Sequence, residues 1–526
     1  MQKYISVPAW AGALAGLTAG GVALGLAQLV AGLFGPQTSP VIAVGDGVVD
    51  LTPAPVKDFA ITTFGENDKT VLVWGVLVLL AVVAAVIGVL ARRRLAYGMA
   101  GLAAFAVVGL VAVVTRPGAS VVDILPTLAG AVGGMWTLAW LLRRATVPAV
   151  SQAPSGEAER PAVMRGSGEP STFDRRRLLT GVAGGVVVAG VGAVAGSRLA
   201  GSRAVDIARV NVALPAPATP AKPIPAGTDL RIGGLSSFVT PNRDFYRVDT
   251  ALVVPQVDPE SWKLRIHGMV DRPVEITYAD LLRMPLTEAD VTLTCVSNEV
   301  GGRLVGNARW LGVRMSEILR RAGLRSDADM LLSTSADGFT CGTPVDVVMD
   351  GREALFAIAM NGEPLPVEHG FPVRQVVPGL YGYVSATKWV VDVKVTRFDR
   401  DEAYWTPRGW AAKGPIKTQS RIDVPGSGAS LKPGRTTIAG VAWAQHKGVA
   451  AVEVRVDGGA WREAKLADVP GPDTWRQWSL DWDATPGSHT LQVRATDTTG
   501  YTQTEQEAPP APDGATGWHT ITVSVA

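Results

Sequence analysis

The side chains with the most versatile chemistry in this chain are two cysteines and five histidines. The cysteines are Cys295 and Cys341, and all five histidines lie after residue 260. Two cysteines are too few for a disulfide-rich scaffold, for a four-cysteine zinc site or for a four-cysteine iron–sulfur cluster. Any sulfur chemistry in this chain must therefore depend on single thiols or on one pair.

Cys295 follows a run of β-forming residues, 291–294, and precedes a turn that contains Gly301 and Gly302. Three interpretations fit this position. The cysteine can be a small buried hydrophobic residue, it can form a disulfide with Cys341 in an exported protein, or its thiolate can ligate a soft, high-valent metal. Composition does not choose among the three.

The sequence around Cys295 resembles the molybdopterin domain of the sulfite oxidase family. The resemblance extends over residues 242–425, and the matching motifs occur in the family's order. They are residues 242–246, similar to the opening cofactor-contact motif, 293–298, similar to the metal-cysteine loop, and then 308–313, 360–366, 369–374 and 385–389. Any one of these motifs is weak, but the ordered set identifies the chain as a member of the family.

The resemblance implies a role for each matching residue. Cys295 is the implied ligand of molybdenum, through its thiolate. The implied contacts with the molybdopterin cofactor are Asn242, Phe245, Tyr246, Ser335, His369, Arg374, Ser385 and Lys388. Among these, Arg374 and Lys388 have the chemistry that a pterin phosphate needs, since a planar guanidinium and an ammonium both pair well with phosphate oxygens.

The resemblance is weaker on the substrate side. Animal and plant sulfite oxidases have an arginine shortly after the cysteine turn, whereas this chain has Glu299 and Val300 there. The position of the family's active-site tyrosine corresponds to the region of Trp410, and Trp410 and Arg408 are therefore catalytic candidates. In the family, the C-terminal domain also contributes an arginine to the site, and other residues replace it within 514–519 of this chain. A pocket that loses arginines should bind the sulfite dianion poorly. The expected reaction is oxygen-atom transfer on a small sulfur-containing or other oxo-acceptor substrate, and reduction of a sulfoxide-type substrate is the alternative.

Two soluble domains are expected to position these residues. Residues 229–430 mix short β-type runs with helical pieces such as 314–322, which predicts an α+β domain. Residues 431–526 read as short strands, for example at 452–456 and 490–495. That spacing is typical of an immunoglobulin-like β-sandwich. The sandwich matches the family's dimerisation domain in place and type, so a homodimer is possible on this resemblance.

Transmembrane α-helices are predicted in the N-terminal part. Apolar runs lie at about residues 7–33, 71–90, 95–114, 121–142 and 178–196. Each is close to the roughly 20 residues that a helix needs to cross a bilayer. The pattern predicts a four-helix membrane region at 1–145, a flexible cytoplasmic linker at 146–177, a fifth anchor at 178–200 and a Pro-rich tether at 201–228.

Arginines indicate which side of the cell membrane each segment faces. They cluster at residues 92–94, 143–144 and 160–177, and the opposite loops are poorer in basic residues. By the positive-inside rule, the linker is cytoplasmic and the two soluble domains are extracytoplasmic. Arg175 and Arg176 before an apolar run also resemble a twin-arginine export signal. A plain positive-inside anchor is the alternative interpretation.

Other classes of function are less well supported. A net charge of +2 gives no indication of nucleic-acid binding. A transporter is unsupported because the apolar runs carry almost no charge, and a metal-free binding protein that keeps the fold is the remaining alternative. Residues 1–266 contain no histidine and the chain has no Cys-x-x-Cys-His motif, so neither haem nor an iron–sulfur cluster is expected. Electrons are expected to pass to or from a separate cytochrome or quinone-linked protein.

Overall fold

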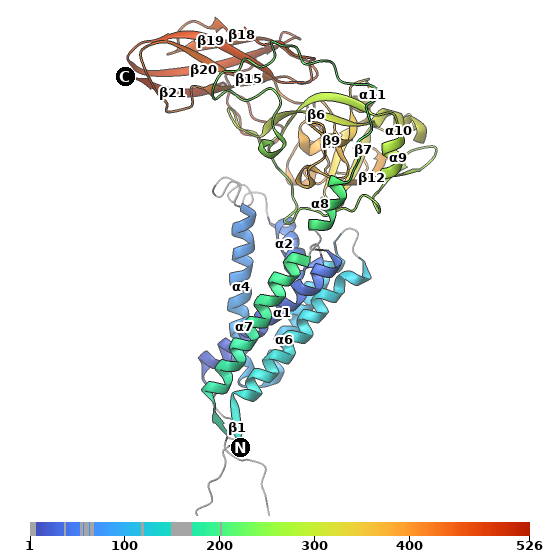
Figure 1. The fold of residues 1–526 in the computed structure, drawn as a ribbon, viewed down its shortest axis with the longest axis vertical. Helices are drawn as coiled ribbons and strands as arrows, with labels where there is room; N and C mark the ends of the chain where they lie inside the picture. The colour runs from blue at the N-terminus through green and yellow to red at the C-terminus, as the bar shows by residue number, and fades with distance from the viewer. Residues whose placement is uncertain are drawn as a thin grey trace, which may run out of the picture. The chain divides into compact units, whose positions relative to one another are not determined.

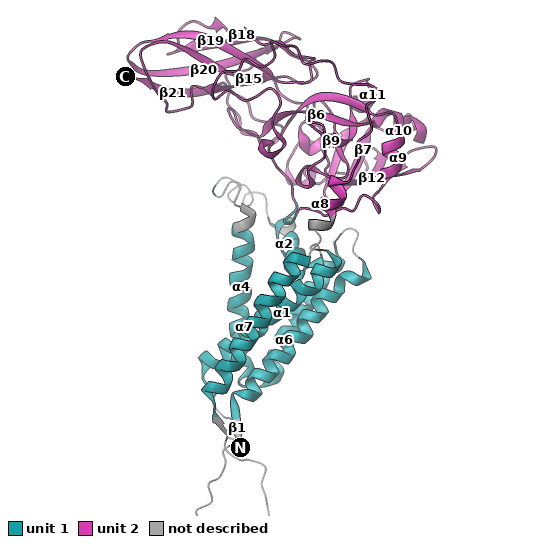
Figure 2. Cartoon of the chain, viewed as in Figure 1, with its two compact units in different colours: residues 1–202, 251–253 teal, residues 203–250, 254–526 magenta. Residues whose placement is uncertain are grey.

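The computed structural model describes residues 7–35, 38–52, 56, 63, 68–116, 120–148, 171–199 and 202–526. The chain divides into two compact units (Figure 2). One comprises residues 1–202 with 251–253, and the other comprises residues 203–250 with 254–526.

The first unit is helical (Figure 1). Its helices are α1 (Ala9–Phe34), α2 (Pro40–Leu51), α4 (Asp68–Ala91), α5 (Leu95–Val114), α6 (Leu125–Arg144) and α7 (Arg175–Leu199), with a 3₁₀ turn, η3 (Val121–Ile124), before α6. Within the described residues, five helical stretches are long and apolar enough to cross a membrane, and they agree with the five predicted runs to within a few residues. The short helix α2 was not predicted.

Glycines allow the helices of this unit to approach closely. Helix α1 contacts α4, α6 and α7. A β-carbon on Gly25 of α1 would lie 2.5 Å from the carbonyl oxygen of Ala189 in α7, and one on Gly12 would lie 2.8 Å from that of Gly88 in α4. Side chains larger than hydrogen would push these helices apart, so the close packing depends on these small residues.

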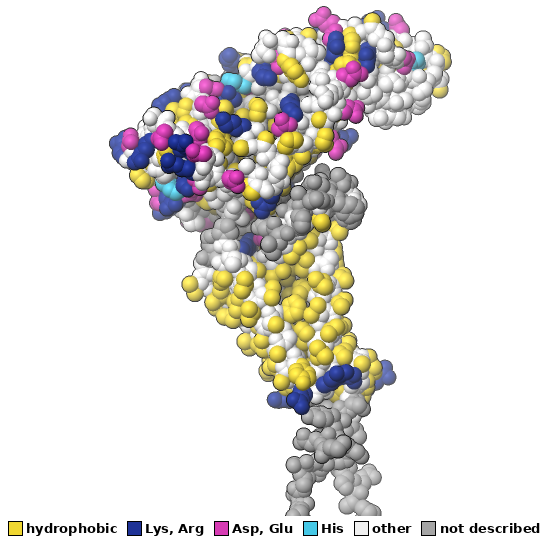
Figure 3. Space-filling view, turned by 180° about the vertical axis from the view of Figure 1, so that it is seen from behind, with side chains coloured by type: hydrophobic (Ala, Val, Ile, Leu, Met, Phe, Trp, Pro, Cys, Tyr) yellow, Lys and Arg dark blue, Asp and Glu magenta, His cyan; other side chains and the backbone are white. Residues whose placement is uncertain are grey.

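The surface of this unit is apolar along the helices and basic at one end (Figure 3). Two arginines near that end contact tryptophan rings: the Arg144 guanidinium lies 4.3 Å from the centroid of Trp140, and that of Arg175 lies 5.8 Å from the centroid of Trp10. Two short antiparallel strands follow α6 and precede α7, β1 (Thr146–Pro148) and β2 (Ser171–Phe173). The predicted flexible linker lies mostly outside the described residues, which omit 149–170.

The second unit begins with a helix where a tether was expected. Helix α8 (Ser202–Val210) places Arg209 so that its guanidinium donates hydrogen bonds of 2.8 Å to the carbonyl oxygens of Pro364 and Leu365. Further on, Thr219 forms a parallel bridge with Thr287. The described part of the segment 201–228 therefore packs along the following domain, because its prolines favour an extended backbone that can pair at the edge of a strand.

An α+β domain follows, with two mixed or antiparallel sheets. The first has the order β10-β9-β6-β5 with β11 on β9, and the second has the order β4-β3-β12-β7-β8. The strands are β3 (Lys263–Gly268), β4 (Val274–Thr277), β5 (Thr287–Thr294), β6 (Val305–Arg314), β7 (Met330–Ser335), β8 (Thr340–Pro344), β9 (Leu355–Met360), β10 (Glu363–Pro364), β11 (Arg374–Val376) and β12 (Val390–Thr396). Helices α9 (Tyr278–Arg283), α10 (Met315–Ala322) and α11 (Val345–Met349) connect them. The predicted helix at 314–322 is α10.

A β-sandwich ends the chain. One sheet has the order β13-β15-β19-β18 and the other β14-β21-β20-β16-β17. The strands are β13 (Gln419–Val424), β14 (Ser430–Leu431), β15 (Gly434–Trp443), β16 (Val449–Val456), β17 (Arg462–Glu463), β18 (Lys465–Leu466), β19 (Arg476–Ala484), β20 (Gly487–Asp497) and β21 (His519–Val525). The sandwich therefore starts at Gln419, earlier than the expected residue 431, because β13 pairs with β15 instead of with the α+β domain.

Candidate active site

Cys295 lies where β5 ends. Its backbone N–H donates to the carbonyl oxygen of Leu304 at 2.9 Å, and its own carbonyl accepts from the N–H of Asn298 at 3.1 Å. The Asn298 side chain closes the same turn, because its Oδ1 accepts from the N–H of Leu304 at 2.7 Å. Gly301 adopts a φ of +76°, which favours glycine. The turn thus holds the Cys295 thiol directly after the C-terminal end of β5. The sequence analysis had predicted a strand end followed by a glycine-containing turn at this position.

The Cys295 thiol is buried, with 8% of the residue exposed. Burial raises its pKa, and hydrogen bonds from the backbone and hydroxyl of Ser297 act in the opposite direction by favouring the thiolate. Both cysteines are free thiols, so the disulfide interpretation is not supported. Cys341, on β8, donates to the carbonyl oxygen of Tyr383 at 3.0 Å, and burial raises its pKa to about 11.

Two asparagines and a histidine form a second hydrogen-bonded group, made of predicted cofactor contacts and their neighbour Asn361. Asn361 donates to Oδ1 of Asn242 at 2.8 Å, and Nε2 of His369 lies 3.1 Å from the carbonyl oxygen of Asn242. Burial, together with the positive charge of Arg374, lowers the pKa of His369 to about 4. The ring is therefore neutral at physiological pH, and its contact with Asn242 ties the predicted motifs at 242–246 and 369–374 together.

Aromatic rings cover the next part of the site. Phe245 stacks on Tyr246 with 5.2 Å between ring centroids, and it meets Trp310 edge to face at 5.8 Å. Burial raises the pKa of the Tyr246 phenol, with a further increase from the charge of Cys295 and a decrease from that of Arg374. The phenol is thus close enough to both groups for their charges to act on it, which brings three predicted contacts into one region.

Arg374 is a buried cation, with 5% of the residue exposed. Its guanidinium donates to the carbonyl oxygens of His369 at 3.0 Å and Gln375 at 3.3 Å, and it lies 5.0 Å from the ring centroid of Trp310. Burial lowers its pKa to about 10. Within the described residues no carboxylate pairs with it. A buried charge without a counterion is costly, so this arrangement indicates a site for an anion.

The remaining predicted cofactor contacts are already engaged by the protein. Lys388 donates to a carboxylate oxygen of Asp249 at 2.8 Å and to the carbonyl oxygen of Glu368 at 3.1 Å. The Ser385 hydroxyl donates to the carbonyl oxygen of Tyr381 at 2.9 Å, and the hydroxyl of Ser335, at the end of β7, accepts from the N–H of Asp337 at 3.4 Å. These side chains shape the backbone around the site.

The two catalytic candidates near residue 410 belong to an aromatic cluster. The Trp410 ring lies 6.0 Å from that of Tyr383 and 6.1 Å from that of Trp405. Arg408 lies with its guanidinium 3.7 Å from the ring centroid of Tyr404. The structure therefore places Trp410 beside the segment that contains Tyr383, and it places Arg408 on the far side of the cluster, against Tyr404.

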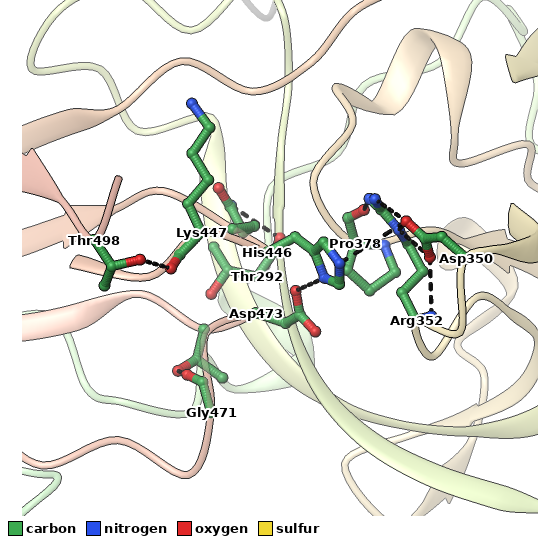
Figure 4. A network of polar contacts seen from close by, with 11 residues as sticks. Thr292, Asp350, Arg352, Pro378, His446, Lys447, Gly471, Asp473 and Thr498 are labelled. Atoms are coloured by element: carbon green, nitrogen blue, oxygen red, sulfur yellow. Dashed lines mark hydrogen bonds and ion pairs between the residues drawn. The ribbon is translucent and has the colours of Figure 1, made fainter. Parts of the chain in front are cut away.

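Residues of the sandwich contact β5 at Thr292, whose N–H donates to the carbonyl oxygen of Asp473 at 2.9 Å, and they also lie near Asp350 (Figure 4). The His446 ring lies 3.2 Å from Asp473 and 3.9 Å from Asp350, and Arg352 bonds Asp350 and the carbonyl oxygen of Pro378. Within the sandwich, the N–H of Ile422 in β13 donates to Nδ1 of His519 at the start of β21. A β-carbon on Gly301 would collide with the His519 ring, so the turn and the sandwich are in close contact.

Comparison with known proteins decides the family. The family described as "Oxidoreductase molybdopterin binding domain" matches residues 251–405, and the one described as "Bacterial Ig domain" matches residues 419–493. The protein named "Uncharacterized oxidoreductase YuiH" of Bacillus subtilis is 33% identical over 157 residues, which are 30% of this chain and 76% of that protein. Mouse mitochondrial sulfite oxidase is 33% identical over 292 residues, 46% of this chain and 53% of that protein.

The chain belongs to the sulfite oxidase family of molybdopterin-dependent oxidoreductases. The resemblance inferred from the motifs is thereby confirmed. This family member spans about half the length of the curated sulfite oxidases that it matches, for example 53% of the mouse protein. Among solved structures, that of the sulfane dehydrogenase SoxCD from Paracoccus pantotrophus is similar, with 26% identity, a TM-score of 0.48 and coverage of 58% of this chain and 88% of that one.

The site fits the cofactor that this family binds. Within the described part of the chain, no group of three or more His, Cys, Asp or Glu side chains could hold a metal ion. A metal at Cys295 therefore needs further ligands from a cofactor. The uncompensated charge of Arg374 suits the phosphate of such a cofactor, and the buried Cys295 thiol suits a soft metal.

Sequence analysis missed three features of this family member's site. Two of them are Tyr381 and Gly514, which are in contact with each other near the Cys295 turn. The third is Gln445 of the sandwich, which donates a hydrogen bond to Thr294 at the end of the strand that leads to Cys295. Tyr381 is in the segment directly before the matched motif at 385–389, and its neighbour Gly382 is the one local signal that could have indicated a turn there. Gln445 and Gly514 carried no signal, because their importance arises from contacts across more than a hundred residues of chain.

Proposed function

We propose that this protein is a membrane-anchored molybdenum enzyme that transfers an oxygen atom to or from a small, uncharged sulfur-containing or other oxo-acceptor substrate. Cys295 would bind the metal as a thiolate, and Arg374 would pair with the phosphate of the pterin. When bound, the molybdopterin cofactor supplies two-electron oxygen-atom transfer. The chain's own residues bind the cofactor, exclude water and select the substrate.

The observation that carries this proposal is the position of Arg374. It is a buried guanidinium without an acidic partner in the described residues, and its charge acts on Tyr246. Burial penalises such a charge unless an anion compensates it. Asn242 and His369 bond one another in the same region, which favours a preformed pterin site over a metal-free structural domain.

An uncharged substrate is favoured because several basic side chains near the site already have partners. Arg247 pairs with Asp249 at 3.5 Å, and Lys417 donates to Asp513 at 2.8 Å. His519 is neutral because burial lowers its pKa to about 4. Glu299 is exposed at the turn itself. A dianion would meet few free cations here, whereas a neutral oxide needs only hydrogen-bond donors.

The membrane part of the proposal rests on five apolar helices and on the basic end of that unit. We propose that this end faces the cytoplasm and that the catalytic domain is extracytoplasmic. The membrane helices then anchor the enzyme or dock a separate electron-transfer partner, a cytochrome or quinone-linked protein. A homodimer through the sandwich also belongs to this proposal.

Metal analysis tests the proposal. The purified wild-type chain should contain about one molybdenum per chain, and Cys295→Ser should lose the activity while remaining folded, because a hydroxyl is a poor substitute for a thiolate on this metal. Cys341→Ser is the matched control, since its partner is a backbone carbonyl that a hydroxyl can also bond. A wild-type chain without molybdenum would favour the alternative, a metal-free membrane-bound binding protein.

A further inference from the structure

Tyr381 has a buried hydroxyl group, and its proton has no acceptor in the part of the chain that the structure describes. The residue is 3% exposed. Its oxygen accepts one long hydrogen bond, 3.4 Å from the N–H of Lys417. Within the described residues, no carbonyl, carboxylate or hydroxyl accepts the phenolic proton. Leaving a buried donor unpaired is unfavourable, so such groups usually face a ligand or a bound water.

The backbone of Tyr381 is fixed beside the Cys295 turn. Its N–H donates to the carbonyl oxygen of Gly414 at 2.8 Å, and its carbonyl accepts from the Ser385 hydroxyl at 2.9 Å. A β-carbon on the next residue, Gly382, would lie 3.8 Å from the carbonyl oxygen of Thr294 and 4.0 Å from the Tyr246 hydroxyl. The chain at 381–382 therefore lies against the residue before Cys295 and against a predicted pterin contact.

The sandwich limits where the hydroxyl of Tyr381 can go. A β-carbon on Gly514 would collide with that hydroxyl and would lie 2.7 Å from Cζ of the ring. Lys417 holds the Gly514 loop by donating to the Gly514 carbonyl oxygen at 2.6 Å and to Asp513 at 2.8 Å. The phenol is thus confined between this loop and the Cys295 region.

We propose that Tyr381 is a specificity-determining residue that donates a hydrogen bond to the oxygen of an uncharged S-oxide substrate beside Cys295, and that the loop at 513–515 holds the phenol in place. This inference rests on the proposed function. A sulfoxide oxygen is a strong neutral acceptor, so a neutral phenol binds it without leaving an unbalanced charge in a buried site.

The phenol keeps its proton under physiological conditions. Burial and, to a smaller extent, the charges of Asp513 and Cys295 together raise the pKa of Tyr381 to about 12, and the bond from Lys417 acts in the opposite direction. The reduction that this arrangement serves converts a sulfoxide, two protons and two electrons to a sulfide and water. A one-electron donor acting twice, such as reduced benzyl viologen in an assay, supplies the electrons, and the S–O bond is broken.

The test uses the full-length holoenzyme with dimethyl sulfoxide as substrate and dimethyl sulfone as an unreactive, uncharged probe. Tyr381→Phe should lower kcat/KM for the sulfoxide by about tenfold or more. It should also abolish the rise in melting temperature that the sulfone produces in the wild type. Molybdenum content should be unchanged. Tyr278→Phe is the control, because Tyr278 is another buried tyrosine without a hydroxyl partner, in the core beside Trp262.

A second variant, in the Gly514 loop of the sandwich, tests the position of the Tyr381 hydroxyl. Gly514→Ala should displace the Tyr381 hydroxyl and reproduce both losses. Gly434→Ala is its matched control, since Gly434 also has a positive φ, +115° against +102° for Gly514, but has open space around it. Gly434→Ala should match the wild type in turnover and in sulfone binding.

The outcomes separate the two proposals. If the wild type reduces the sulfoxide and Tyr381→Phe has the same kcat/KM and the same response to the sulfone, the proposed role of Tyr381 is wrong and the proposed function still stands. A wild type that contains molybdenum but neither reduces the sulfoxide nor binds the sulfone would overturn the S-oxide substrate. A wild type without molybdenum would overturn both proposals at once.

Discussion

The side-chain amide of Gln445 donates a hydrogen bond of 3.0 Å to the hydroxyl of Thr294, the residue that precedes Cys295. The same amide bonds the carbonyl oxygen of Thr292 at 3.0 Å, and the N–H of Trp475 donates to the Thr292 hydroxyl at 2.7 Å. Two residues of the sandwich, Gln445 and Trp475, thus form hydrogen bonds with the C-terminal end of strand β5. The position of the Cys295 thiol therefore depends on contacts from a different domain.

Replacing Gln445 should consequently weaken cofactor binding from a distance. In Gln445→Ala, a buried carbonyl and a buried hydroxyl of β5 lose their donor, which costs about 1–3 kcal/mol per unsatisfied group. We expect a lower melting temperature and less molybdenum per chain than in the wild type. Gln506→Ala, at an exposed position of the sandwich, is the control. Wild-type metal content in Gln445→Ala would show that the β5 end is rigid without the sandwich.

A pH dependence of stability should arise from His519. Its half-buried ring packs against Gly301, and this partial burial lowers its pKa to about 4, whereas an unfolded histidine has a pKa of about 6.5. Between these values the unfolded state binds the proton and the folded state does not. Stability should therefore fall as the pH drops from about 6.5 to about 4. The melting temperature of His519→Asn should change less over this interval. If the melting temperatures of the wild type and of His519→Asn depend on pH with the same slope between about pH 4 and about pH 6.5, the His519 ring is not held neutral by its surroundings.

Sulfite should be a poor substrate. Glu299 and Val300 stand where sulfite oxidases have an arginine, and Arg247 is paired with Asp249. We expect little or no reduction of ferricyanide by sulfite at concentrations up to the millimolar range. Arg303, exposed in the same turn, is the basic residue to replace if sulfite is oxidised. A KM for sulfite in the micromolar range of a typical enzyme would show that the pocket binds dianions.

The parts of the fold and site that could be predicted are those encoded by neighbouring residues. The Cys295 turn was recognisable because strand, cysteine and glycines are contiguous, and the five apolar helices because each is one uninterrupted run. Helix α2 was missed, since Asp46 and two glycines interrupt its apolar pattern. Tyr381 and Gly514 are 133 positions apart in the chain and meet only in the folded state, so no local pattern could pair them.

Membrane topology can be tested with reporter fusions. A fusion after Arg144 should report a cytoplasmic location and one after Ala204 an extracytoplasmic one, because the arginine clusters favour the cytoplasmic side. Replacing Arg175 and Arg176 by lysine should block export if they form a twin-arginine signal. It should have little effect if they form only a positive-inside anchor. A cytoplasmic result for the later fusion would contradict both the five-crossing topology and the extracytoplasmic active site.

Electron exchange should require a separate partner. Oxygen-atom transfer moves two electrons, and a haem that relays them needs axial ligands, usually histidine or histidine with methionine. Residues 1–266, which include all five apolar helices, contain no histidine. With two cysteines in the chain, one of them assigned to molybdenum, a four-cysteine iron–sulfur cluster cannot form either. We therefore expect molybdenum to be the only redox centre of the isolated chain.

An absorption spectrum of the purified chain measures this directly. It should lack a Soret band, and reduced enzyme should be reoxidised slowly until a cytochrome or a quinone-linked membrane fraction is added. The apolar helices would then serve as the anchor or as the surface on which that partner docks. A stoichiometric Soret band that persists through purification would contradict the prediction. It would mean that the helical unit binds haem through ligands other than histidine, such as its methionines or backbone groups.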